Sequence, residues 1–314
     1  MKINTITLNP VYDVMIRVPN FRPFGENVAA SRAVFSGGKG INVSRALLSS
    51  GFGRITGPAF LLLGEENGRA LENDLRAFGL DVRACYVPGR TRENLTFVSD
   101  GLPETRVSSN DFSAESSDLQ RLLTEIRSIA EPDDILVMSG KTPKGLSDGD
   151  RLGFFRELTR LTPCVALDSG SFSAEEIHRL RPWIIKPNEE ELDALIGAPC
   201  PTLPDRIAAV SSLCREGLPN VLLSLGGDGA IYGGEKGFFR VSVPRIKPVS
   251  TVGSGDSLLA GLTSAFAEGL TIEEALTRAC AFGTACCLEP GPNPPKPDAI
   301  ARIARDVTVT AIAR

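Results

Sequence analysis

Short runs of aliphatic and β-branched residues alternate with amphipathic stretches along most of the chain. This alternation is typical of βα units arranged around a largely parallel sheet. The pattern predicts strands at residues 3–8, 55–63, 135–138, 165–168, 183–186 and 221–225. It predicts helices at residues 41–50, 68–78, 116–129, 152–161, 189–196, 204–215, 258–268 and 272–287.

Two regions interrupt this alternation, residues 11–35 and residues 89–110. Both are rich in strand formers, arginine and turn residues, and neither has a helical period. Long stretches without regular structure are rare in a compact domain. We therefore expect the two regions to pair as a small β-sheet lid, and residues 1–10, 36–88 and 111–314 to form one αβα domain that binds nucleotide and substrate.

Composition narrows the class of protein. The 314 residues are 42% hydrophobic and 23% charged, with a net charge of −4, which is typical of a soluble globular enzyme and gives no basic excess for binding nucleic acid. The chain has no apolar run long enough to span a membrane and no signal-peptide layout at its N-terminus, so we expect a cytoplasmic protein. The seven cysteines lack Cys-x-x-Cys spacing and are expected to be reduced thiols. We interpret the single histidine, His178, as a surface residue, which disfavours Ser-His-Asp hydrolysis.

A glycine-rich turn precedes the predicted helix at residues 258–268 and contains Gly253, Ser254, Gly255 and Asp256. Because glycine has no Cβ, the backbone N–H groups of the turn and of the helix N-terminus can converge on an anion. A carboxylate beside such an anion site can act as a general base while the N–H groups stabilise a transferring phosphoryl group. The local sequence alone supports a simple helix-capping role for Asp256 at least as well.

A second glycine cluster, at residues 36–43, also leads into a predicted helix and contains Gly37, Gly38 and Lys39. It is not a P-loop, because Gly40 follows the lysine where Ser or Thr is needed and Ala33 replaces the first glycine. A Gly-x-Gly-x-x-Gly dinucleotide fingerprint is also missing between the predicted strands and helices.

These two clusters resemble the signature segments of the PfkB family of ribokinase-like sugar kinases. Four further segments occur in the order of that family: Thr7-Leu8-Asn9-Pro10 with Asp13, Gly89-Arg90-Thr91-Arg92-Glu93-Asn94, Lys186-Pro187-Asn188-Glu189-Glu190-Glu191 and Ser224-Leu225-Gly226-Gly227-Asp228-Gly229. The resemblance implies a three-layer αβα ribokinase-like domain with a mostly parallel central sheet and a small β-sheet lid. It also implies ATP, Mg²⁺ and phosphorylation of a sugar hydroxyl.

Within that family, the first and second of the four segments are similar to the branch of phosphosugar kinases that contains 1-phosphofructokinase and tagatose-6-phosphate kinase. The resemblance implies a ketohexose monophosphate as substrate, with fructose 1-phosphate expected first and tagatose 6-phosphate or fructose 6-phosphate as the alternatives. It further suggests a homodimer formed through the lid.

The resemblance assigns roles in transfer and sugar binding. Asp256 is expected to be the base, with the backbone of Gly253, Ser254 and Gly255 as the anion hole. The residues expected to bind the phosphosugar are Asp13, Gly37, Gly38, Asn42 and Ser139 around the sugar, and Lys39, Arg90 and Arg92 at its phosphate. Lys141 has two open interpretations, a further phosphate contact or a solvated cation.

Other positions are assigned to the nucleotide. The residues expected to contact ATP are Lys186, Asn188, Ser224, Gly226, Gly229, Gly253 and Gly255. Asn188 and Glu191 match an Asn-x-x-Glu element that the family uses around Mg²⁺, often through water. The same pair also fits a helix capping box, and both roles can hold together. Related kinases often have Asn where Cys286 stands, so the selectivity of the adenine pocket stays open.

Two other classes of function are weighed against a kinase. A non-catalytic sugar-phosphate sensor would keep the fold and lose transfer, but the intact Lys39 and Asp256 disfavour it. A nicotinamide-dependent oxidoreductase suits the βα alternation, and the missing dinucleotide fingerprint disfavours it.

Overall fold

A ten-stranded sheet forms the centre of the molecule in the computed structural model, which describes residues 1–109 and 112–312. The strands are β1 (Ile3–Thr7), β4 (Thr56–Gly64), β5 (Val82–Val87), β8 (Ile135–Ser139), β9 (Val165–Asp168), β10 (Ile184–Ile185), β11 (Asn220–Ser224), β12 (Ala230–Gly234), β13 (Gly237–Ser242) and β14 (Thr308–Ala311). Their order is β14-β13-β12-β11-β10-β9-β8-β1-β4-β5. Neighbours are parallel from β5 to β11 and antiparallel from β11 to β14. The sheet is therefore mostly parallel, as predicted.

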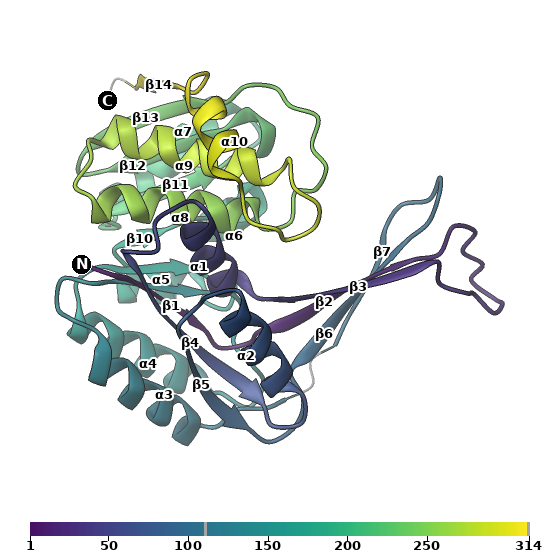
Figure 1. The fold of residues 1–314 in the computed structure, drawn as a ribbon. Coiled ribbons are helices and arrows are strands. Elements are labelled where there is room, and N and C mark those ends of the chain that lie inside the picture. The colour runs from purple at the N-terminus through teal and green to yellow at the C-terminus, as the bar shows by residue number, and fades with distance from the viewer. Residues whose placement is uncertain (110–111, 313–314) are drawn as a thin grey trace.

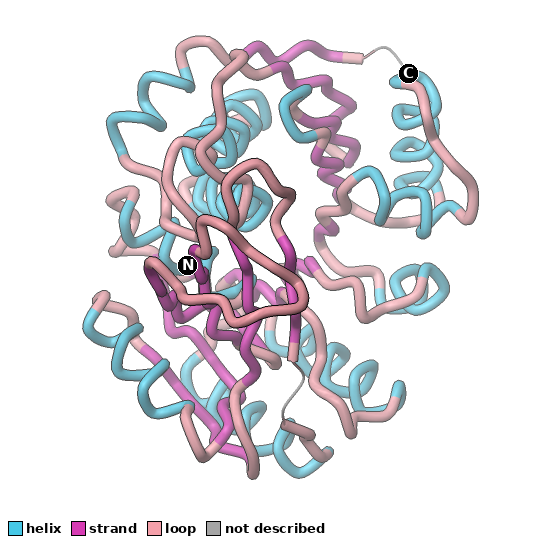
Figure 2. Tube along the Cα trace, turned by 90° about the vertical axis from the view of Figure 1, so that its right-hand side faces the viewer, coloured by secondary structure: helices cyan, strands magenta, loops and turns pink. Residues whose placement is uncertain are grey.

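Helices cover both faces of this sheet (Figure 2). One face packs against α3 (Ser116–Ile129), α4 (Asp148–Leu161), α5 (Ala174–Leu180), α6 (Glu189–Ile196) and α7 (Leu203–Arg215). The other packs against α1 (Lys39–Ser49), α2 (Gly68–Ala77), α8 (Ser254–Ala267) and α9 (Ile272–Cys286), with α10 (Pro297–Ala304) lying on α9. Alternate residues of a strand serve opposite faces, so Leu136 and Met138 of β8 join one core and Ile135 and Val137 the other. This burial on both faces explains why these strands read as continuous apolar runs.

The helices α8 and α9 approach each other unusually closely. A Cβ atom added at Gly261 of α8 would lie 2.8 Å from the Cα atom of Ala279 in α9. Only glycine permits this contact between the two backbones. The two helices thus form one packed unit beside the sheet.

A second sheet of four strands projects from the main body (Figure 1). It contains β2 (Val11–Arg17), β3 (Ser31–Gly37), β6 (Arg92–Val98) and β7 (Thr105–Ser108), in the order β3-β2-β6-β7. We call it the small sheet. The two regions that interrupt the βα alternation therefore pair with each other, as predicted. The expected end of the second region, residue 110, and the expected start of the next αβα segment, residue 111, lie outside the described residues.

Several elements were not predicted from the sequence pattern. They are β5, α5, η1 (Gly226–Asp228), the hairpin of β12 and β13, α10 and β14. The hairpin strands contain several glycines, and β14 is an exposed edge strand, so neither has a strong apolar period. The segment predicted at residues 183–186 is strand only at Ile184–Ile185.

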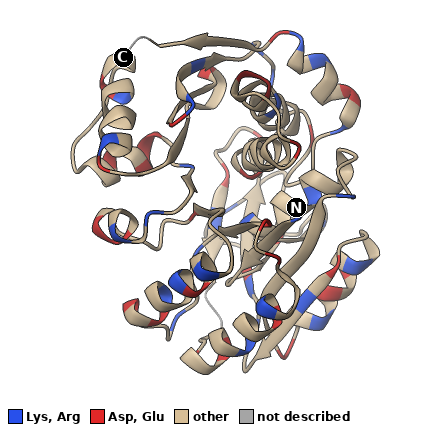
Figure 3. Ribbon diagram, turned by 90° about the vertical axis from the view of Figure 1, so that its left-hand side faces the viewer, with Lys and Arg blue, Asp and Glu red and all other residues tan. Residues whose placement is uncertain are grey.

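The seven cysteines and His178 are all buried or partly buried. All seven cysteines are free thiols and none is exposed. His178 is partly buried and partly exposed. Its Nδ1 atom lies 2.7 Å from the carbonyl oxygen of Ala174, and its Nε2 atom lies 2.6 Å from Glu216. Positive and negative side chains are interspersed on the side of the molecule drawn in Figure 3. Within the described residues, every helix is too short or too polar to cross a membrane.

Candidate active site

Asp256 lies at the start of α8, directly after the turn at Gly253. Gly253 adopts φ of +80°, a left-handed conformation that favours glycine, and α8 begins at the next residue. The Asp256 side chain is only 6% exposed. Its Oδ2 atom accepts a hydrogen bond of 2.8 Å from Nδ2 of Asn42, which lies in α1. The two glycine clusters predicted from the sequence are therefore joined by a direct contact.

A comparison with Asp118 shows that Asp256 does not serve as a cap. Asp118 is also the third residue of its helix and is 7% exposed, and its carboxylate accepts from the backbone N–H group of Glu115 in a capping box. The first residue before α8 is Gly253, and no side chain caps that helix. Asp256 is thus a buried carboxylate with no capping role, which argues against the structural interpretation of its sequence position.

The surroundings of Asp256 raise the pKa of its carboxyl group toward neutral pH. Burial raises the pKa of Asp256, and the negative charge of Asp168 raises it further. The hydrogen bond from Asn42 and the positive charges of Lys39 and Lys186 lower it, and the pKa stands at about 6. A carboxylate with this pKa is suited to accept a proton near neutral pH.

Two lysines meet at one buried aspartate beside this turn. Asp168, at the carboxyl end of β9, is 2% exposed, and its Oδ1 atom lies 3.1 Å from Nζ of Lys39. Its Oδ2 atom lies 3.6 Å from Nζ of Lys186 and has no hydrogen-bond partner. A Cβ atom at Gly255 would lie 3.1 Å from Nζ of Lys186, so this lysine borders the glycine-rich turn at residues 253–256.

Lys39 is surrounded by acidic side chains. Burial alone would lower the pKa of Lys39, but the negative charges of Asp168, Asp256 and Glu191 outweigh burial and hold that pKa above its ordinary value. Lys39 therefore stays charged, close to Asp256. This setting differs from the sugar-phosphate site expected for Lys39 from the sequence.

The predicted sugar-binding residues gather where the small sheet meets α1. Asp13 of β2 accepts a hydrogen bond of 2.9 Å from Asn94 of β6. A Cβ atom at Gly37 would lie 3.2 Å from Asp13 Oδ2 and 3.7 Å from Asn42 Oδ1. That oxygen of Asn42 is buried and has no hydrogen-bond partner. Asn42 thus connects Asp256 to a cluster of polar groups beside Gly37, where the lack of a side chain leaves space.

The backbone beside that cluster is equally crowded. Gly38 has φ of +137°, and a Cβ atom there would lie 2.9 Å from the Thr7 side chain. Burial raises the pKa of Asp13, although the hydrogen bond from Asn94 and the charge of Arg92 oppose the shift. Arg92 itself donates to the carbonyl oxygen of Asn9 at 3.4 Å. This guanidinium therefore lies within the polar cluster.

The other predicted phosphate and sugar contacts differ in exposure. Arg90 is half-exposed and lies 3.5 Å from Glu66 and 3.9 Å from Glu93. Ser139, at the end of β8, is buried and its hydroxyl has no hydrogen-bond partner. Lys141 is exposed. These placements leave Arg92, rather than Arg90, in closest association with Asp13.

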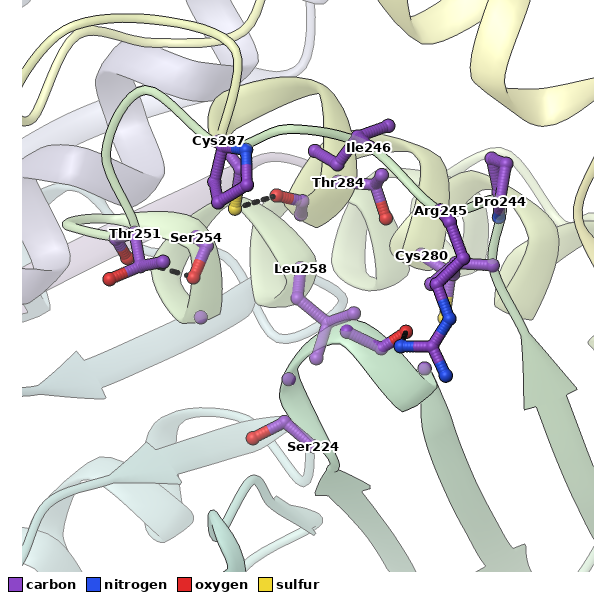
Figure 4. A pocket seen from close by; sticks show the side chains of 17 residues that line it. Ser224, Pro244, Arg245, Ile246, Thr251, Ser254, Leu258, Cys280, Thr284 and Cys287 are labelled. Carbon is purple, nitrogen blue, oxygen red and sulfur yellow. Dashed lines mark hydrogen bonds between the residues drawn. The ribbon is translucent and has the colours of Figure 1, made fainter.

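A cavity of about 240 Å³ lies between η1, the loop at residues 243–251 and α9 (Figure 4). Ser224, Gly226 and Gly229, predicted to contact the nucleotide, line it together with Ser254 and Gly255 of the glycine-rich turn. The remaining lining is largely apolar, and Leu258 points toward its centre. A mostly apolar cavity that ends at an N–H-rich turn is suited to a ligand with a flat apolar part and an anionic tail.

One face of α9 forms the wall of this cavity. The residues that line it are Cys280, Gly283, Thr284 and Cys287, which follow at helical spacing into the C-cap. Cys286 lies off this face and is completely buried. Its Sγ atom lies 3.7 Å from the carbonyl oxygen of Val252 and 3.6 Å from that of Asn293. Cys286 therefore packs behind the glycine-rich turn, and Cys287 borders the cavity instead.

Asn188 and Glu191 form the capping box that the sequence allowed. Asn188 Oδ1 accepts from the N–H group of Glu191 at 2.8 Å, and Glu191 Oε2 accepts from the N–H group of Asn188 at 2.9 Å. Glu191 also borders a second cavity, of about 390 Å³, together with Asp168 and Lys186.

Magnesium fits this set of donors. Carboxylate and amide oxygens are hard ligands, and Asp168 Oδ2 is a buried oxygen without a hydrogen-bond partner. Among the described residues, no three His, Cys, Asp or Glu side chains are arranged to enclose a metal ion. An ion that is held through water and through the phosphates of a nucleotide does not need such an arrangement.

The family model of pfkB family carbohydrate kinases matches residues 7–299, and the chain belongs to this family. It is therefore a sugar kinase, a phosphotransferase that acts on an alcohol group. This confirms the family and the fold class predicted from the ordered motifs.

Its relatives include several named phosphosugar kinases. The chain is 32% identical to the 1-phosphofructokinase of Borreliella burgdorferi over 91% of this chain and 92% of that protein. It is 30% identical to the tagatose-6-phosphate kinase of Staphylococcus epidermidis, with the same shares covered. The structure of phosphofructokinase-2 from Escherichia coli in complex with substrates and products superposes with a TM-score of 0.88 at 26% identity, over 97% of this chain and 99% of that chain.

Sequence reasoning missed some residues of the site. Asp168 ends a predicted strand. Because the carboxyl ends of parallel strands carry binding residues in α/β folds, its position alone could have marked it as a candidate site residue. The cavity-lining residues of α9 follow the i, i+3, i+4, i+7 spacing and could have been found from it. Asn94 stands in a quoted motif, but its contact with Asp13 depends on the pairing of β2 with β6.

Proposed function

We propose that this enzyme phosphorylates fructose 1-phosphate to fructose 1,6-bisphosphate with ATP as the phosphoryl donor. The observation that supports transfer most strongly is the buried Asp256, with its raised pKa, at the glycine-rich start of α8. The names of the relatives at 30–32% identity support a phosphosugar as the acceptor.

The roles of the residues follow from their positions. Asp256 accepts the proton of the attacking hydroxyl, and the backbone N–H groups from Gly253 onward stabilise charge on the transferring phosphoryl group. Lys39 lies beside Asp256 and Asp168, so we assign it to the transferred phosphoryl group. The cavity along α9 takes the nucleotide.

Mg²⁺ would enter with ATP and would be held by Asn188 and Glu191 through water. When bound, it neutralises charge on the phosphates. Lys186, between Asp168 and Gly255, adds a fixed positive charge on the protein side of that site.

The phosphate already present on the sugar is assigned to Arg90 and Arg92. Arginine can bind a phosphate through two hydrogen bonds, and these two side chains stand at the root of the small sheet. Asp13 and Asn42 would bind sugar hydroxyls. We further propose that the small sheet is a lid over the sugar, formed by residues 11–35 and 89–110.

The identity of the substrate is tested with a panel of sugars. ADP release with Mg²⁺ and ATP is measured for fructose 1-phosphate, fructose 6-phosphate, tagatose 6-phosphate and unphosphorylated fructose. We expect the highest kcat/KM with fructose 1-phosphate. A higher value with tagatose 6-phosphate or fructose 6-phosphate would replace the proposed substrate, and tight binding of sugar phosphate without ADP release would favour a sensor.

We also propose a homodimer through the small sheet. Its outer strands β3 and β7 have free edges and expose Val34 and Val107, and the loop between β2 and β3 carries the fully exposed Phe24. The backbone N–H and C=O groups along such edges can pair with another chain or be covered by one. A solved form of the Escherichia coli phosphofructokinase-2 is described as tetrameric. Sedimentation equilibrium of the intact enzyme tests the proposal, and a mass of one chain at all concentrations would contradict it.

A further inference from the structure

Asn67 stands immediately before α2, at the position whose side chain normally accepts an N–H bond from the helix that follows. It makes no such bond. Asn188 holds the same position before α6, and there the side chain does cap the helix. The same residue type at the same helical position thus has two different uses, and the Asn67 side chain is directed elsewhere.

The amide of Asn67 holds the backbone of Thr91 from both sides. The N–H group of Thr91 donates to Asn67 Oδ1 at 2.7 Å, and Asn67 Nδ2 donates to the carbonyl oxygen of Thr91 at 3.0 Å. The Thr91 hydroxyl in turn accepts from the N–H group of Gly64 at 2.9 Å, and Thr91 is completely buried. One residue of this turn is therefore fixed through its N–H, its carbonyl and its side chain.

Thr91 lies between Arg90 and Arg92, the arginines assigned to the substrate's phosphate. Thr91 directly precedes β6, and successive residues of a strand point to opposite faces. The burial agrees, since Thr91 is buried and both arginines are partly exposed. Fixing Thr91 therefore fixes the two points from which the guanidinium groups extend.

Asn67 also reaches the other connection of the small sheet. Its carbonyl oxygen accepts a hydrogen bond of 2.7 Å from the hydroxyl of Tyr12, which lies in β2 next to Asp13. Tyr12 is buried. Asn67 therefore contacts both segments that carry the sugar-binding and phosphate-binding side chains.

We propose that Asn67 is a positioning residue that sets the recognition of the phosphate already carried by the sugar, acting through Thr91 on Arg90 and Arg92. The inference rests on the proposed function. Loss of the amide leaves the N–H and carbonyl groups of Thr91 buried without these partners, and the turn must relax to satisfy them. The guanidinium groups then lose the fixed spacing that two-point binding of a phosphate requires.

The experiment compares fructose 1-phosphate with unphosphorylated fructose in Asn67→Ala, Asn67→Asp and Tyr12→Phe. For Asn67→Ala we expect KM for fructose 1-phosphate to rise about 10- to 100-fold, the range that two buried unsatisfied backbone groups imply, with KM for ATP little changed. The preference for the phosphorylated sugar should shrink by a similar factor. Asn67→Asp keeps the acceptor for the Thr91 N–H group and should lie between Asn67→Ala and wild type, and Tyr12→Phe should have the smallest effect.

Thr202→Ala is the matched control. Thr202 caps α7, which contributes no described residue to either cavity, so its loss should reduce stability without changing the preference between the two sugars. Equal losses on both sugars in Asn67→Ala, or an unchanged preference, would overturn the inference and leave the proposed function standing. A wild-type enzyme with no preference for the phosphorylated sugar would overturn the proposed function and the inference with it.

Discussion

The glycine-rich turn before α8 and the small sheet differ in how deeply their residues are buried. Asp256 is buried at the start of α8, and most residues of that helix are buried as well. Every residue of β6 is only partly buried, and every residue of β7 is exposed. Phosphoryl transfer is thus assigned to a buried turn, and sugar recognition to a small sheet whose outer strands β3 and β7 are largely exposed.

The sharpest test of this contrast is Asp256→Asn. Removing a general base costs about 10²- to 10⁴-fold in rate, and we expect kcat to fall by that amount while ATP affinity stays nearly unchanged. Turnover kinetics and calorimetric ATP binding measure the two quantities. Asp118→Asn is the matched control, because this aspartate has the same helical position and burial. Similar kcat in wild type and Asp256→Asn would end the assignment of the base.

Gly64→Ala attacks the root of the small sheet. The added Cβ atom would lie 2.4 Å from the backbone of Arg90 and Thr91, so the turn must move. We expect the free energy of unfolding to fall by about 1–3 kcal/mol, the usual cost of overpacking. KM for the sugar should rise more than KM for ATP. Urea denaturation and steady-state kinetics measure these changes.

Gly153→Ala serves as the control for that substitution. Gly153 lies within α4, where an added Cβ atom meets no other atom within 4 Å. Alanine should therefore stabilise this helix by about 0.5–1 kcal/mol. Equal stability changes at the two glycines would show that the contact at Gly64 is unimportant.

The pH profile tests the charges around the base. Asp256 must be unprotonated to accept a proton, so kcat should fall as the pH drops through its pKa of about 6. Lys39 lowers this pKa, so in Lys39→Met the acid limb should move to higher pH, by about one unit or less. Lys144→Met, at an exposed lysine outside both cavities, should leave the limb in place. An acid limb of the pH profile that stays in place in Lys39→Met would contradict the inferred effect of Lys39 on the pKa of Asp256.

The smallest effect is expected at the tip of the small sheet. Phe24 is fully exposed within one chain, so Phe24→Ser should change the stability of the monomer by no more than about 0.5 kcal/mol. If the small sheet forms the dimer, the same substitution should weaken association, which sedimentation at several concentrations detects. Unchanged association would place the interface elsewhere.

The sequence predicted the parts of this molecule that depend on local pattern. Continuous apolar strands and helices with a clear period were found, as was the fold class. The ordered motifs identified Asp256 and Asn42, which the structure brings into contact. The predicted roles of the site residues remain to be tested.

Other features depend on distant partners. Asn67 has the sequence pattern of an ordinary helix cap, and only the fold shows that its amide binds Thr91. Asp168 likewise acquires its setting from Lys39 and Lys186 on other segments. The cavity lining also depends on the exact position along α9. Successive helix residues point about 100° apart, so Cys287 lines the cavity and Cys286 does not.

The close approach of α8 and α9 at Gly261 has a consequence for how such enzymes can change. Because the two backbones touch, Asp256 and the face of α9 that lines the cavity belong to one closely packed unit. If Asp256 is the base and this cavity takes the nucleotide, as proposed, the distance between them does not depend on the strands of the small sheet. Exchanging those strands for the corresponding ones of a relative should alter which sugar is accepted while leaving the transfer step intact.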